Sequence, residues 1–184
     1  MATRRTASRK SRSSAARSRA AIRIARTTVA RRGGVKPGTA RTKTDGAIRG
    51  GHGRYQFNLA EVKDVPAGTG YSTSHGGVVE GARMLVGYIH KPRGTGSRMH
   101  THKNEQFNYV VRGTLVGSVN GRKVVAPAGT LIYIPANAPH TLVAAADDED
   151  VIFIAIKDLS QGIIGKAVDG TMTGPHYDPG FGPD

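Results

Sequence analysis

The chain has 184 residues, enough for one domain of ordinary size and an appendage. It holds 27 lysines and arginines against 13 acidic residues and no cysteine, which excludes disulfide scaffolds, cysteine-based zinc sites and thiol nucleophiles. No apolar run approaches the ~18 residues that a membrane helix needs, so we expect a soluble protein without a membrane span.

The positive charge is concentrated in residues 1–54, which hold 16 of the 27 basic residues and a single acid, Asp45. A segment so rich in arginine and serine buries too little apolar surface to fold, and we predict a disordered basic extension. A cationic arm over residues 1–50 would bind nucleic acid through its phosphates, without reading sequence. An organelle transit peptide and an extension without a role are the competing interpretations. In the absence of a secretory signal we expect a cytoplasmic protein, unless the extension directs it to an organelle.

From Tyr55 onward, short apolar segments alternate with turn residues. Seven segments have the length and composition of β-strands, at residues 82–89, 107–111, 114–119, 123–126, 130–134, 141–144 and 151–156. Asn120 and Gly121 mark a type I′ turn, whose two central residues both need positive φ. This spacing predicts an all-β domain over residues 55–169, followed by a Gly/Pro-rich tail at residues 170–184.

Histidines provide the clearest sign of chemistry. His100 and His102 are two residues apart at the entry to a strand, so an extended backbone points both rings to one face. Gln106 shares their parity if the chain stays extended or returns in register, and His140 follows a proline-containing turn. Imidazoles are the commonest ligands of divalent transition metals. The alternative is two surface histidines and one histidine that serves a turn.

The residues around these histidines resemble the two sequence motifs of the cupin family. The first motif is matched by Gly94, His100, His102, Gln106 and Gly113, with glutamine where the family normally has glutamate. The second is matched by Gly129, Pro135, Asn137, His140 and Ala144, where the family usually has glycine at 137 and asparagine at 144. The resemblance is close over residues 94–144, loose over about residues 65–165, and does not cover the basic extension.

This resemblance implies a single-domain jelly-roll β-barrel with one divalent metal ion, Fe, Mn, Ni or Zn, inside it. Cupins of this subtype commonly bind metal through three histidines and the glutamine, which here are His100, His102, Gln106 and His140. Glu105 has the opposite parity and would replace Gln106 only if the strand slipped by one residue. Four neutral ligands leave the full metal charge uncompensated, which favours an anionic ligand such as a small oxygen-rich organic acid.

The resemblance implies the fold and a bound metal, but it does not select a reaction, because cupins include enzymes and non-catalytic proteins. We expect a metal-dependent enzyme of the dioxygenase, isomerase or lyase type. The alternative is a non-catalytic metabolite-sensing or metal-binding protein whose basic arm binds nucleic acid.

Three further residues are candidates for catalysis. Arg98 and Asn108 share the parity of the implied ligands, and Tyr88 lies on the preceding strand. The competing interpretations are an exposed loop arginine, an asparagine that pairs with a neighbouring strand and a tyrosine that fills the barrel. Alternate residues such as Phe107 and Tyr109 would then face outward. An apolar outer face implies burial under the N-terminal strands or under a second subunit. Cupins often dimerise in this way, so we expect a homodimer.

Overall fold

The computed structural model describes residues 42–159, 165–168 and 174–183. Within these residues the protein consists of β-strands and one 3-10 turn, Leu59–Glu61, which confirms the predicted all-β class. Residues 1–41 lie outside the described residues, and with them most of the predicted basic extension. The described part of the chain has no helix with the length and apolar character that crossing a membrane requires.

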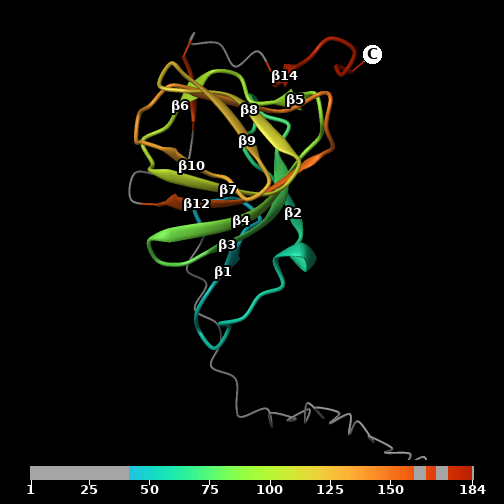
Figure 1. Ribbon diagram of the computed structural model, residues 1–184. Coiled ribbons are helices and arrows are strands. Elements are labelled where there is room, and N and C mark those ends of the chain that lie inside the picture. The colour runs from blue at the N-terminus through green and yellow to red at the C-terminus, as the bar shows by residue number, and fades with distance from the viewer. Residues whose placement is uncertain (1–41, 160–164, 169–173, 184) are drawn as a thin grey trace, which may run out of the picture. The chain divides into compact units, whose positions relative to one another are not determined.

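The described strands pair into two sheets (Figure 1). The first has the order β1 (Ile48–Arg49), β3 (His75–Glu80), β4 (Met84–Lys91), β12 (Val151–Asp158), β7 (Gln106–Arg112) and β10 (Leu131–Ile134), and β2 (Asp64–Pro66) also pairs with β3. The second has the order β13 (Lys166–Ala167), β6 (His100–Thr101), β11 (His140–Ala144), β5 (Thr95–Gly96) and β14 (His176–Tyr177). In it, β8 (Thr114–Val119) pairs with β11 and with β9 (Arg122–Pro127). Among the described residues these pairings do not close into the single barrel that was expected.

Apolar side chains from both sheets form the core between them. On β4, Leu85, Ile89 and Lys91 are buried while the alternate residues are more exposed, as the two-residue period of a strand requires. Leu115 of β8 and Leu142 of β11 contribute from the second sheet. Each such side chain contributes roughly 1.5–3 kcal/mol to stability when it is fully buried.

All seven predicted strands are present, with bounds that differ by a few residues. The predicted turn between β8 and β9 is also confirmed, because Asn120 has φ 50° and Gly121 has φ 75°. Asn137 has φ 62°, a left-handed conformation that asparagine tolerates better than most residues.

Strand β3 was missed, because its sequence begins His-Gly-Gly and glycine is unfavourable in strands. The structure explains the first of these glycines, Gly76, by a close approach of β4. A Cβ added at Gly76 would lie 2.0 Å from the carbonyl oxygen of Tyr88.

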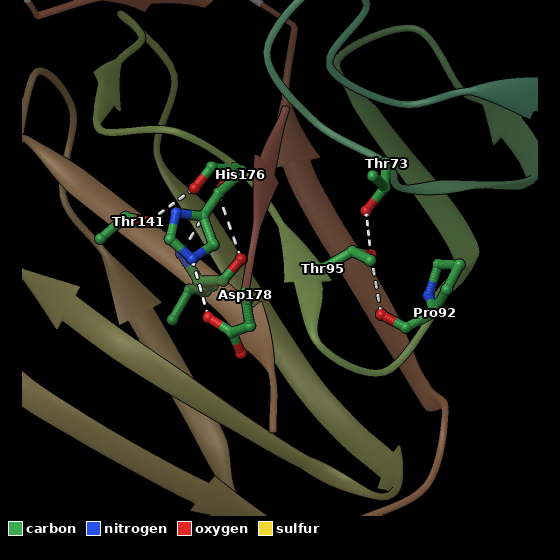
Figure 2. Close-up of polar contacts among 8 residues, drawn as sticks. Thr73, Pro92, Thr95, Thr141, His176 and Asp178 are labelled. Atoms are coloured by element: carbon green, nitrogen blue, oxygen red, sulfur yellow. Dashed lines mark hydrogen bonds and ion pairs between the residues drawn. The ribbon is translucent and has the colours of Figure 1, made fainter. Parts of the chain in front are cut away.

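The segments at both ends of the predicted domain also form strands. Ile48–Arg49, inside the predicted extension, pairs in parallel with β3, and His176–Tyr177, inside the predicted tail, pairs with β5. Figure 2 shows the contacts at this edge, where Thr95 bonds both Thr73 and the carbonyl oxygen of Pro92 at 2.7 and 2.8 Å. The domain limits at residues 54 and 169 stay predictions.

Candidate metal centre

Three buried histidines converge on one point between the sheets. The nitrogen atoms that His100, His102 and His140 offer to a ligand all lie within 4.8 Å of one another. Their ring centroids are 4.1 Å apart for His100 and His140, and 4.7 Å apart for His102 and His140. The structure therefore brings together the three histidines that the two sequence motifs singled out, and the surface-histidine alternative does not hold.

Backbone pairing places these side chains. His100 of β6 and His140 of β11 are direct partners in the second sheet, so their side chains leave neighbouring strands side by side. The amide of Asn137 donates a hydrogen bond to the carbonyl oxygen of His102 at 2.8 Å. The left-handed turn of the second motif is thus tied directly to the first motif.

All three rings are oriented in the same way, by a hydrogen bond from Nδ1 to a backbone carbonyl oxygen. The acceptors are Arg98 for His100 at 2.7 Å, Asn104 for His102 at 2.9 Å and Ala138 for His140 at 2.9 Å. With the proton held on Nδ1, the Nε2 lone pair of each ring is left for a ligand, as in protein metal sites generally.

The Nε2 atom of His102 is buried and has no hydrogen-bond partner. A buried polar atom without a partner is costly, and a metal ion at the point where the rings converge would satisfy it. The donor set therefore fits a divalent transition metal.

Burial and neighbouring charges keep these imidazoles neutral. Burial, together with repulsion from His140, lowers the pKa of His100 to about 3. Burial, and to a smaller extent repulsion from Lys157, lowers the pKa of His102 to about 4. Burial also lowers the pKa of His140 to about 4. At neutral pH each ring is in the deprotonated form that binds metal.

Gln106 reaches the same cavity from the opposite sheet. The chain leaves β6 after Thr101 and enters β7 of the first sheet at Gln106, so the glutamine faces the histidines across the interior and not from their own strand. Its Nε2 donates to Oδ1 of Asn108 at 2.8 Å. This bond fixes the amide so that its carbonyl oxygen is the group available to a metal.

Glu105, the alternative ligand, is exposed. Its carboxylate accepts a hydrogen bond from the Tyr133 hydroxyl at 2.7 Å on the outer side of the first sheet. This position agrees with the parity argument that favoured Gln106.

A cavity of about 400 Å³ lies between the sheets next to the histidines. Its lining includes His100, His140, Gln106 and Asn108. The buried ring of Tyr71 also lines it, with its centroid 4.3 Å from that of His100.

Two lysines of the cavity were missed by the sequence reasoning. Burial lowers the pKa of Lys91 to about 7 and that of Lys157 to about 8. The available signal was parity, since Lys91 shares the inward face with Ile89, and Lys157 shares it with Ala155.

Of the three candidate catalytic residues, only Asn108 contributes its side chain to the cavity lining. Tyr88 lies on the outer face of β4, where its ring packs edge-on against His90 at a centroid distance of 5.3 Å. Arg98 acts on the centre through its backbone, which accepts the Nδ1 hydrogen of His100 and donates to the carbonyl oxygen of Tyr71.

The fold and the site define a two-sheet β-protein with a buried three-histidine centre. Residues 87–157 match the family model of the cupin domain, in agreement with the resemblance that the two motifs indicated. A search of curated proteins gave no match.

Solved structures of other cupins resemble this chain. A cupin-2 domain from Rhodospirillum rubrum is 17% identical over 61% of this chain and 79% of its own, with a TM-score of 0.51. An RmlC-like cupin from Shewanella frigidimarina is 20% identical over 58% of this chain and 91% of its own, with a TM-score of 0.48. A cupin 2 domain-containing protein from Halorhodospira halophila is 21% identical over 47% of this chain and 61% of its own, with a TM-score of 0.43. The first of these likenesses supports the fold alone.

Proposed function

We propose that the protein binds one divalent transition-metal ion, Fe, Mn, Ni or Zn, through the Nε2 atoms of His100, His102 and His140 and the carbonyl oxygen of Gln106. The observation that carries this proposal is the shared orientation of the three rings: each Nδ1 is bonded to a carbonyl oxygen, and the nitrogens that the rings offer to a ligand lie within 4.8 Å of one another. The two-sheet arrangement around this centre also favours the jelly-roll architecture of cupins.

We further propose that the protein is an enzyme of the dioxygenase, isomerase or lyase type, acting on a small oxygen-rich organic acid that binds the metal. A metal held by neutral ligands supplies Lewis-acid polarisation of the bound oxygen atoms. The chain itself supplies a cavity between the sheets, and Lys91 and Lys157 make its interior favourable to an anion. Asn108 holds the Gln106 amide in its orientation and is therefore a positioning residue.

A homodimer is proposed from the outer face of the first sheet. Tyr109 and Val111 of β7 are 45% and 44% exposed, and Leu131 and Tyr133 of the adjacent β10 are 56% and 47% exposed. Contiguous apolar surface of this kind is rare on monomers and marks an interaction face. A second copy, related by a two-fold axis, would cover it. The cytoplasmic location and the binding of nucleic acid by residues 1–50 stay predictions.

The metal centre is tested by elemental analysis of protein purified without added metal. We expect about one transition-metal ion per chain in the wild type, little in His102→Ala, and the wild-type content in His176→Ala. His176 bonds Asp178 at 2.9 Å on strand β14 and is therefore a matched control. Equal metal content in His102→Ala and wild type would contradict the site.

Catalysis is tested on the same preparations. Oxygen uptake and product formation with a panel of small organic acids and catechols would be lost on chelation and restored by one metal. Metal that is retained without turnover of any of these compounds would favour the non-catalytic alternative.

A further inference from the structure

Lys91 places a basic side chain inside the protein, and the described residues provide no ion-pair partner for it. The residue is 3% exposed, and its Nζ donates to the carbonyl oxygen of Leu142 at 2.6 Å. Its Nζ also lies 5.9 Å from the ring centroid of Phe153. None of the ion pairs in the described residues includes Lys91. Asp45, the acidic residue that lines the cavity, is exposed.

A buried ammonium without a countercharge is expensive, and the cost after relaxation is still several kcal/mol. An apolar residue of similar length would avoid this cost. Burial lowers the pKa of Lys91 to about 7, so the free protein holds both amine and ammonium near neutrality, and an anion bound beside Nζ would favour the ammonium. The cavity next to Lys91 has room for such an anion.

The position of Lys91 relative to the histidines defines the shape of that anion. Its acceptor, Leu142, follows His140 by two residues on β11, and both side chains are buried. Two residues of strand span roughly 6–7 Å, so Lys91 lies one such step along the cavity from the proposed metal centre. Ser97 is also at this point, since its hydroxyl and its amide both donate to the carbonyl oxygen of Leu142.

We propose that Lys91 binds a second anionic group of the acid held at the metal, so that the cavity selects a short dicarboxylate over a monocarboxylate. This inference rests on the proposed metal-bound acid. Lys91 acts as a specificity-determining residue: the ammonium pairs with the carboxylate that the metal does not hold. The remaining Nζ hydrogens supply charge-assisted hydrogen bonds, which are the stronger class.

The test measures binding of acetate, malonate and succinate to the Zn-loaded, full-length protein by isothermal titration calorimetry. Lys91→Met and Lys91→Gln remove the charge, and Lys123→Met, on the exposed part of β9, is the control. Of malonate and succinate, we expect the one with the higher affinity to bind wild type and the control at least tenfold more tightly than acetate does. Both Lys91 variants should lose that preference while keeping one zinc ion per chain and their affinity for acetate.

Two results would overturn the inference alone: a zinc-loaded wild type without preference for dicarboxylates, or Lys91 variants that keep the preference. A wild type that holds no zinc would instead contradict the proposed metal centre, and the inference with it. Zinc content is measured first on every variant, so the two failures are distinguishable. Two substitutions at position 91 guard against a folding defect in one of them.

Discussion

His100 and His140 are direct Cα partners across β6 and β11, and their ring centroids lie 4.1 Å apart. This pairing joins one histidine from each of the two sequence motifs, 40 residues apart in the chain, into one centre. Because each Nδ1 is bonded to a carbonyl oxygen two residues earlier in its own segment, the local backbone sets the orientation of both rings. The centre is thus preformed by the fold.

Replacing Gln106 by Glu should keep the metal and weaken binding of the acid. The carboxylate would lower the net charge of the centre from +2 to +1, and the attraction for an anionic ligand would fall. We expect at least a tenfold loss of succinate affinity in titration calorimetry, with unchanged zinc content. Unchanged affinity for succinate would count against the neutral ligand set.

Metal binding should persist into acid. Metal competes with protons for the imidazoles, and it does so only near and below the pKa values of the metal-free folded protein. These values are about 3 for His100 and about 4 for His102 and His140, against 6.5 for an ordinary histidine. After dialysis at graded pH, elemental analysis should find the metal retained at pH 5 and released near pH 3–4. Half-release near pH 6.5 would show that the rings titrate like surface histidines.

Lys91 should make the free energy of unfolding depend on pH above neutrality. Burial lowers its pKa in the folded protein from 10.5 to about 7, so between these values the unfolded chain binds more protons. Stability attributable to this residue therefore rises with pH across that window, by about 1.4 kcal/mol for each pH unit.

This dependence is measured by urea unfolding of wild type and Lys91→Met at pH 7 and pH 9, without carboxylate buffers. From pH 7 to pH 9, the free energy of unfolding of wild type should rise by roughly 2–3 kcal/mol relative to that of the variant. A difference between the two proteins that is the same at both pH values would mean that Lys91 titrates normally.

The proposed dimer face is tested by introducing charge. Tyr109 and Leu131 are Cα partners across β7 and β10 and are both exposed, so Tyr109→Glu or Leu131→Glu places a carboxylate in the centre of the apolar surface. Light scattering should show a dimer for wild type and a monomer for either variant. The control is Val125→Glu, because Val125 lies on β9 of the other sheet and is 58% exposed. This variant should remain a dimer. Identical masses for wild type and both face variants would contradict a dimer through this sheet.

The sequence allowed the strands and the histidines to be predicted, because both depend on local pattern. Alternation and turn residues located the seven strands, and the His-x-His spacing placed His100 and His102 on one face. Asn108 was assigned to the inner face of β7 by the same argument, and it is 2% exposed.

Contacts between distant segments were harder to predict. The passage from β6 to the opposite sheet before Gln106 depends on long-range bonds, such as the one from the Glu105 amide to the Asp158 carboxylate at 2.6 Å. Tyr88 was assigned to the interior without considering that Leu85, Ile89 and Lys91 fix the inward parity of β4. Lys91 was missed for a related reason: a lysine is normally assumed to face solvent.

The most direct test of the metal centre is X-ray absorption spectroscopy at the K-edge of the metal that the purified protein carries. A centre built from His100, His102, His140 and Gln106 should show three imidazole nitrogens and one or more oxygens bound to the metal, with the nitrogens at about 2.0–2.1 Å if the metal is zinc. The variant His102→Ala should lose this spectrum. A bound metal whose spectrum shows no imidazole scattering, or the same spectrum from His102→Ala, would contradict a three-histidine metal centre.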